Sequence, residues 1–152
     1  MLLKDRRLGA VLLLTAVTAL ACSEDTSGPS FLPRNFAINA AGGSGVTGTV
    51  TITDQTGAAS TVAVTLQGMA PGSSHAGHVH RGTCGSDGAI DFGLAPITAD
   101  AAGNGSATTN VADNLLAPGF YLQYHVALDP PGAPLACANI PEAVAGGTDG
   151  GY

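Results

Sequence analysis

Charged residues are scarce in this chain: Asp, Glu, Lys and Arg together make up 11% of the 152 residues, whereas 45% are hydrophobic. Disordered chains combine low hydrophobicity with many charges, so this composition excludes the disordered class. The sequence contains no internal repeat, and its length suits one compact domain better than two. We therefore expect a single folded core.

Basic residues are the rarest charged group, with five Lys and Arg in all, and three of them lie within the first seven residues. The apolar run that follows, residues 8–21, is typical of a signal-peptide core and is too short to remain in a bilayer as a spanning helix. Removal of residues 1–21 leaves Arg34 and Arg81 against ten carboxylates, a formal charge near −8. Such a domain has no basic face for phosphates, which excludes nucleic-acid binding.

Cysteine is also rare, and the first of the three cysteines stands directly after the apolar run, in the sequence ALAC at residues 19–22. These four residues fit a bacterial lipobox, in which Cys22 becomes the lipidated first residue after cleavage. The two alanines also fit an ordinary signal-peptidase site. The cysteine at the cut favours an exported lipoprotein, periplasmic or on the cell surface, which Cys22 anchors to the membrane. Residues 22–33 then form a flexible tether, which Pro and Gly interrupt.

The other two cysteines, Cys84 and Cys137, are expected to form a disulfide. Export places them in an oxidising compartment, and the lipid anchor takes the third cysteine. Two free thiols would be unusual outside the cytoplasm.

No segment between the turns shows helical periodicity, whereas alternation with a period of two is strict. Residues 46–53, VTGTVTIT, place four threonines on one face and Val46, Gly48, Val50 and Ile52 on the other, which indicates a half-buried strand. Residues 61–67 repeat this alternation, and a turn over residues 54–60 predicts a hairpin. Further strands are expected at residues 36–40, 77–81, around Ile97, and at 106–111 and 120–127. The 22 glycines and 9 prolines fit the intervening turns. The predicted fold is all-β, an antiparallel Greek-key sandwich or barrel over residues 34–152.

Three of the four histidines lie within residues 75–80, HAGHVH. Alternation directs His78 and His80 to one face of their strand and Val79 to the core. In the strand at residues 120–127, His125 shares the outward face with Tyr121 and Gln123. The expected core face of that strand comprises Phe120, Leu122, Tyr124 and Val126. All three histidines can therefore lie outside a barrel with an apolar interior.

Three imidazoles from two strands suit copper or zinc, because imidazole is a borderline ligand and a His-x-His pair in a strand can converge on one ion. Three ligands with an open fourth position are typical of a catalytic metal site. The alternative interpretation is that His78 and His80 are ordinary surface residues on a polar strand face.

Over residues 46–140 the chain resembles the copper/zinc superoxide dismutase family. The stretch LQGMAPGSSHAGHVH is similar to the strand and loop that lead into the family's His-Gly-Phe-His-Val-His block. LAPITADAAGNG is similar to its Leu-Gly-Asn-Val-Thr-Ala-Asp turn, YHV to its next copper-ligand strand, and PLACANI to its Leu-Ala-Cys-Gly-x-Ile segment. The resemblance implies the following roles: copper ligands His78, His80 and His125; a structural histidine, His75, which donates to a backbone carbonyl; and half-cystines Cys84 and Cys137.

The chain also departs from that family. The loop that carries the family's bridging histidine and further zinc ligands is shortened to GSDGAIDFGLAP, and alignment on the Thr-Ala-Asp turn puts Ile90 and Gly93 where the last zinc ligands belong. The zinc site is therefore expected to be absent. Pro134 stands where the family has an arginine that attracts superoxide, and Arg81 is the one candidate to replace that arginine. Chordin-type (CHRD) domains look similar to this shortened form.

Two functions follow from this comparison. The first is a copper-binding, dismutase-like lipoprotein, either a weak copper-only enzyme acting on superoxide or a copper-holding protein. The second is a metal-free structural or interaction module of the cell envelope with the same fold.

Overall fold

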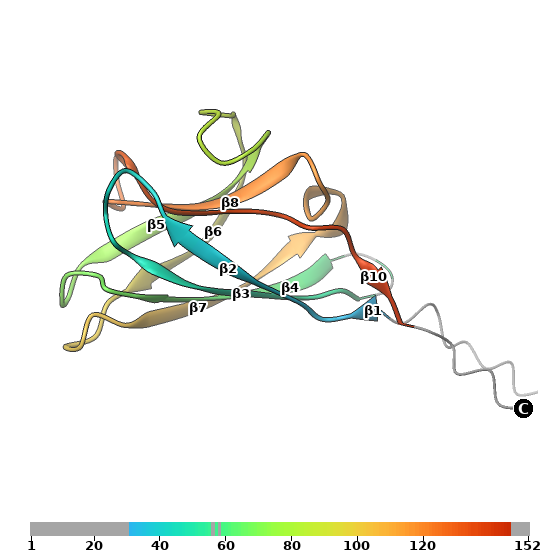
Figure 1. Cartoon of the computed structure of the whole chain (residues 1–152), viewed down its shortest axis with the longest axis horizontal. Coiled ribbons are helices and arrows are strands. Elements are labelled where there is room, and N and C mark those ends of the chain that lie inside the picture. The colour runs from blue at the N-terminus through green and yellow to red at the C-terminus, as the bar shows by residue number, and fades with distance from the viewer. Residues whose placement is uncertain (1–30, 56, 58, 147–152) are drawn as a thin grey trace, which may run out of the picture.

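The computed structural model describes residues 31–55, 57 and 59–146. Eight antiparallel strands form one sheet that curls into a nearly closed barrel (Figure 1). The strand order is β6-β5-β8-β9-β2-β3-β4-β7. The strands are β2 (Arg34–Ala40), β3 (Thr47–Thr53), β4 (Ala59–Gln67), β5 (Ser74–Arg81), β6 (Ile90–Thr98), β7 (Gly105–Ala112), β8 (Phe120–His125) and β9 (Pro134–Asn139).

Three pairings join strands that are distant in sequence: β4 with β7, β5 with β8, and β2 with β9. Such long-range antiparallel pairs are the mark of Greek-key connections. Within the described residues the only helical element is a 3₁₀ turn, η1 (Asp113–Leu115), and no helix there is long and apolar enough to cross a membrane. The predicted fold class is confirmed. The expected signal peptide and Cys22 lie outside the described residues.

The barrel interior is built by the period-two alternation of the strands. In the predicted hairpin, β3 and β4 pair in a register that sets Val50 opposite Val64, and both valines are buried. Thr49 and Thr65, paired on the outer face, share a hydrogen bond of 2.8 Å. Alternate residues thus separate an apolar interior from a polar outer face.

The interior also determines where β5 and β8 can meet. The ring of Tyr124 fills the space that a side chain at Gly77 would need, since a Cβ there would stand 2.6 Å from the ring. The Tyr124 hydroxyl donates to the carbonyl oxygen of Ala95 on β6 (3.0 Å). A residue without a side chain is therefore required at Gly77, directly before His78.

Arg34 holds one end of the barrel together. Its buried guanidinium makes two hydrogen bonds to Asp54, of 3.0 and 2.6 Å, and donates to the carbonyl oxygens of Leu116 and Pro141. These partners belong to the end of β3, the loop after η1 and the segment after β9. One cation thus satisfies two carbonyls and a carboxylate that the chain brings to the same place.

Three details differ from the sequence predictions. A short pair, β1 (Phe31–Leu32) with β10 (Val144–Ala145), begins inside residues 22–33, which the sequence assigned to a tether. Strand β9 was not predicted, because it is buried on both faces and therefore lacks alternation. Strand β8 ends at His125, and Val126, expected in the core, is 48% exposed. The register shifts between Tyr124 and His125, which ends the alternation there.

Candidate metal centre

Three histidines from two neighbouring strands form a cluster on the outer side of the barrel wall. Strand β5 supplies His78 and His80, and β8 supplies His125. Each offers one ring nitrogen, and these nitrogens all lie within 4.8 Å of one another. The core-facing residue between the first two, Val79, is fully buried in the interior, as the alternation predicted. The structure thus brings together the three residues that the sequence selected as ligands.

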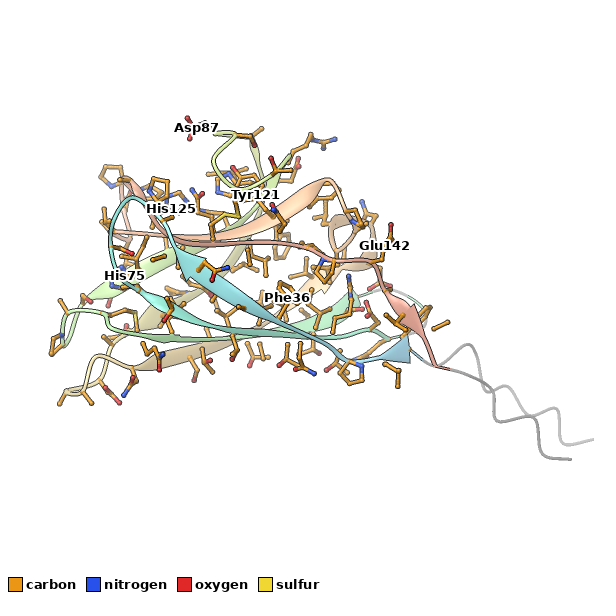
Figure 2. The ribbon with its side chains drawn as sticks, viewed as in Figure 1. Phe36, His75, Asp87, Tyr121, His125 and Glu142 are labelled. Atoms are coloured by element: carbon orange, nitrogen blue, oxygen red, sulfur yellow. A yellow bond between two sulfur atoms is a disulfide. The ribbon has the colours of Figure 1, made fainter. Side chains whose placement is uncertain are left out.

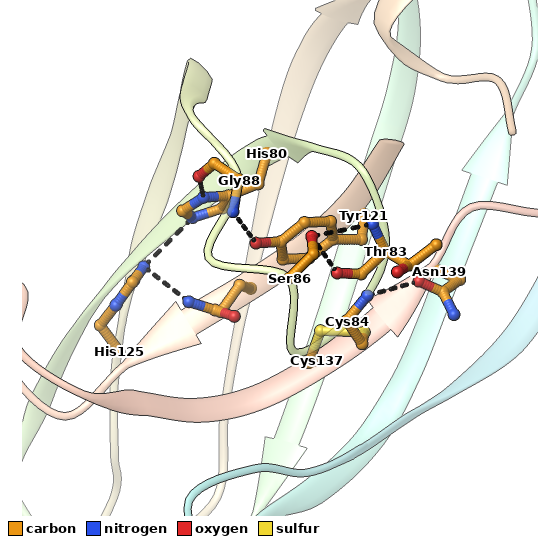
Figure 3. Close-up of a disulfide and its surroundings, with 10 residues drawn as sticks. His80, Thr83, Cys84, Ser86, Gly88, Tyr121, His125, Cys137 and Asn139 are labelled. Atoms are coloured by element: carbon orange, nitrogen blue, oxygen red, sulfur yellow. Dashed lines mark hydrogen bonds between the residues drawn. A yellow bond between two sulfur atoms is a disulfide. The ribbon is translucent and has the colours of Figure 1, made fainter. Parts of the chain in front are cut away.

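The imidazole of His80 is held in one orientation by the loop over residues 82–89 (Figure 3). Its Nδ1 donates to the carbonyl oxygen of Gly88 (2.9 Å), which leaves Nε2 with a free lone pair. The ring stacks on Tyr121 with centroids 5.0 Å apart. The Tyr121 hydroxyl accepts a hydrogen bond from the backbone N–H of Gly88 (3.1 Å). A Cβ at Gly88 would collide with the carbonyl oxygen of Arg81, so this close approach requires glycine.

His125 is oriented in the same manner by the loop over residues 126–133. Its Nδ1 donates to the carbonyl oxygen of Gly132 (3.0 Å). Its Nε2 faces the Nε2 of His80 at 3.3 Å. Both Nδ1 hydrogens are already donated, so two lone pairs point at one another unless a cation lies between them. Two nitrogen ligands of a tetrahedral ion, bound at about 2.0 Å, also lie about 3.3 Å apart.

The third nitrogen is the Nδ1 atom of His78. It is buried, and it has no hydrogen-bond partner among the described residues. The ring of His78 lies edge-on to that of His125, with centroids 5.0 Å apart. A buried polar atom without a partner is costly, and a bound metal ion removes that cost. The donor set is therefore Nδ1 of His78 with Nε2 of His80 and Nε2 of His125, and it fits a metal ion that accepts imidazole nitrogen.

Local electrostatics favour neutral imidazoles, the form that binds metal. Burial lowers the pKa of His78 below its ordinary value of 6.5, and His125 and His80 nearby lower it further. Burial also lowers the pKa of His125, although the hydrogen bond to Gly132 opposes the shift. At neutral pH both rings can thus accept a metal without first losing a proton.

The histidines lie outside the apolar interior, as predicted, but two of them are not at the surface. His80 is 5% exposed and His125 is 6% exposed, because the loops over residues 82–89 and 126–133 cover them. His78 is half-buried. The cluster is therefore enclosed on two sides and accessible from the side of His78.

His75 lies near the cluster but outside it (Figure 2). It is buried, and its Nδ1 donates to the backbone carbonyl oxygen of His125 (2.8 Å). Its Nε2 lies 2.7 Å from the hydroxyl of Ser73. The hydrogen bond to a carbonyl is the one expected of a structural histidine, and it fixes the backbone of the third cluster residue.

Cys84 and Cys137 form the predicted disulfide. Cys137 lies in β9, and the bridge fastens the loop over residues 82–89 to the barrel wall (Figure 3). The backbone N–H of Cys84 also donates to the side-chain oxygen of Asn139 (2.8 Å). Four residues later this loop supplies the Gly88 carbonyl that orients His80. The bridge itself indicates an extracellular or otherwise oxidising compartment.

Arg81 does not take the position over the cluster that the sequence allowed for it. Its side chain is 66% exposed and forms an ion pair with Asp91 (3.1 Å), and its guanidinium lies 5.4 Å from the centre of the Phe120 ring. The alternation that sends His80 to the outer face turns the next residue, Arg81, away from that face. Pro134, at the expected arginine position, is paired with His125 in the β8–β9 ladder.

Tyr121 and Gln123 lie beside the cluster. The sequence predicted that they share the outer face of β8 with His125, but it indicated no role for them. Tyr121 supports His80 and Gly88, as described above. The side-chain amide nitrogen of Gln123 lies 3.4 Å from Nε2 of His125, and this residue is buried. The period-two alternation of β8 was the only signal that could have pointed to either.

Comparison with known proteins does not identify the chain. No protein-family model matches it, and no curated protein is similar to it. The structure shows a nearly closed eight-stranded barrel with a disulfide and a three-histidine cluster that can hold a metal ion.

Proposed function

We propose that this chain is an exported, superoxide dismutase-like lipoprotein that binds one copper ion through His78, His80 and His125, with weak or no dismutase activity. The observation that carries the proposal is the convergence of three histidine ring nitrogens within 4.8 Å of one another. Backbone carbonyls fix two of the rings so that Nε2 faces the site. This is the outer-shell support that metal-binding histidines ordinarily have.

The choice of copper depends on the resemblance of the sequence to the dismutase family and on the donor set. Three neutral imidazoles suit copper in either oxidation state, and they also suit zinc. A copper ion held there would supply one-electron redox chemistry. The protein's own part is to lower the pKa of His78 and His125, to fix the orientation of His80 and His125, and to leave one side open next to His78.

Weak dismutation follows from the charges around the site. Superoxide is an anion, and fast reaction with it needs a local positive field. Among the described residues the two cations, Arg34 and Arg81, are both paired with carboxylates. Neither contacts the histidine cluster. A copper-holding role therefore agrees with the structure at least as well as catalysis does.

The test is copper titration of the mature chain. We expect about one copper per chain, zinc that binds only in its place, and a Cu(II) EPR spectrum with nitrogen hyperfine structure. His125→Ala should weaken binding by about 10- to 1,000-fold, because a lost ligand costs a few kcal/mol at 1.4 kcal/mol per decade. The matched control is His75→Ala, which removes the fourth histidine without removing a ligand and should retain the stoichiometry.

Two outcomes would contradict the proposal. One is copper binding that persists unchanged in the triple variant His78→Ala, His80→Ala, His125→Ala, since the ion would then lie elsewhere. The other is absence of copper or zinc binding in the unaltered chain. That outcome would favour the metal-free envelope module.

A further inference from the structure

Gln123 is the one amide side chain in direct contact with the histidine cluster in the described part of the chain. It lies on β8, two residues before His125, and is paired with His78 across the β5–β8 ladder. It is 6% exposed, and its amide nitrogen lies 3.4 Å from Nε2 of His125. The amide is thus beside the atom that would bind the metal.

The contact has a defined direction. Nδ1 of His125 carries the ring hydrogen, because it donates to the Gly132 carbonyl. Nε2 therefore presents a lone pair, and only the N–H group of the amide can face it. When that lone pair is given to a metal ion, the amide donor loses its acceptor. A buried donor without an acceptor is costly, so a new acceptor is favoured at the same place.

One side of Gln123 borders a surface groove. Gln123 lines a surface groove of about 620 Å³ that also includes Pro134, Asn39 and the two disulfide cysteines. Pro134 is the ladder partner of His125. The groove thus touches two immediate neighbours of the cluster but none of its three histidines, so access to the metal position itself is from the side of His78.

We propose that Gln123 donates its amide N–H to a small monovalent anion held at the open side of the metal ion that the three histidines bind. This inference rests on the proposed function. A neutral amide stabilises such an anion once it has arrived but does not attract it from a distance. Gln123 thus serves as a short-range substitute for a cation, and the ligand class is small oxygen or nitrogen anions.

The experiment is azide titration of the copper-loaded mature chain, followed through the azide-to-copper charge-transfer band. Gln123→Met keeps the length of the side chain but removes the donor. Loss of one hydrogen bond to a charged acceptor should weaken azide binding by about 10- to 100-fold. Copper affinity, measured by competition with a chelator, should change by less than about threefold. The matched control is Asn39→Leu, which alters the same groove away from the cluster and should leave both affinities unchanged.

Three results would overturn the inference. Equal azide affinity in the unaltered chain and in Gln123→Met would show that the amide makes no such bond. A parallel loss of copper affinity would make the amide a metal ligand instead. Absence of copper binding in the unaltered chain would overturn the proposed function, and the inference with it. If Gln123→Met does not fold, Gln123→Asn, which draws the amide back by one methylene, should show the same loss of azide affinity.

Discussion

Two histidines of the cluster, His78 and His125, have lowered pKa values, and this has a consequence for stability. Burial lowers the pKa of His78 and of His125 in the folded chain, whereas in the unfolded chain both titrate near 6.5. Well above pH 6.5 both states are neutral at these positions. As the pH falls below 6.5, the unfolded chain takes up protons that the folded chain resists, so unfolding becomes more favourable.

We therefore expect the metal-free protein to lose stability as the pH falls from about 7.5 to about 5, where the unfolded rings are charged. Urea unfolding at the two pH values measures the loss. In the double variant His78→Asn, His125→Asn the loss should be smaller, because both titrating rings are gone. An equal loss in the variant and in the unaltered chain would show that other groups control the pH dependence.

The loop over residues 82–89 connects the disulfide to the metal centre. Cys84 is bonded to Cys137 across a sequence separation of 53 residues, and Gly88 orients His80. Closing a loop of that length stabilises the folded state by about 4 kcal/mol in the chain-entropy model. The bridge also restrains the carbonyl that keeps the His80 ring in place.

Replacement of Cys84 and Cys137 by serine should therefore have two effects. The free energy of unfolding should fall by about 2–5 kcal/mol, measured by urea denaturation. Copper affinity should fall by about 10-fold, as for loss of an outer-shell partner. In the unaltered protein, thiol labelling of the unfolded, unreduced mature chain should label neither Cys84 nor Cys137. Full labelling of both would contradict the pairing itself.

The net charge of the whole molecule acts against an anionic substrate. The full chain has a formal charge of −6, and removal of the proposed signal peptide would leave Arg34 and Arg81 against ten carboxylates, a charge near −8. Salt screens charges beyond about 10 Å at 0.1 M, so added salt should weaken this repulsion. We expect a slow reaction of the copper-loaded protein with superoxide, whose rate constant rises with ionic strength. Pulse radiolysis in an inert salt measures it. A rate constant near about 10⁹ M⁻¹s⁻¹ that falls with salt would contradict this expectation.

The histidine cluster and the first described residues lie toward opposite ends of the barrel. Strands β1 and β10 pair at one end of the barrel, and His125 lies toward the other end (Figures 1 and 2). The proposed anchor on Cys22 precedes β1 in sequence, so it is joined to the end of the barrel opposite to His125. Cys22→Ser should move the protein from the membrane fraction to the soluble fraction, whereas Cys84→Ser should not. Soluble wild-type protein that begins at Ser23 or later would contradict the lipobox interpretation.

Period-two alternation in the sequence was sufficient to predict the all-β class, the β3–β4 hairpin and the common face of His78 and His80. It succeeds because a strand sends successive side chains to opposite sides, so that a strand with one face in the apolar interior has an apolar residue at every second position. The pairing of Cys84 with Cys137 followed from the number of cysteines and the expected compartment.

Only the tertiary structure decided what covers the outer face. Alternation placed Tyr121 and Gln123 on the side of the histidines, but it could not show that loops bury them there. The carbonyls of Gly88 and Gly132 that orient two imidazoles come from loops without any period, and the ion pair of Arg81 depends on a bulged neighbouring strand. Local periodicity determines the face on which a side chain lies. Its contacts there are made by residues distant in sequence, and those are determined only when the sheet closes.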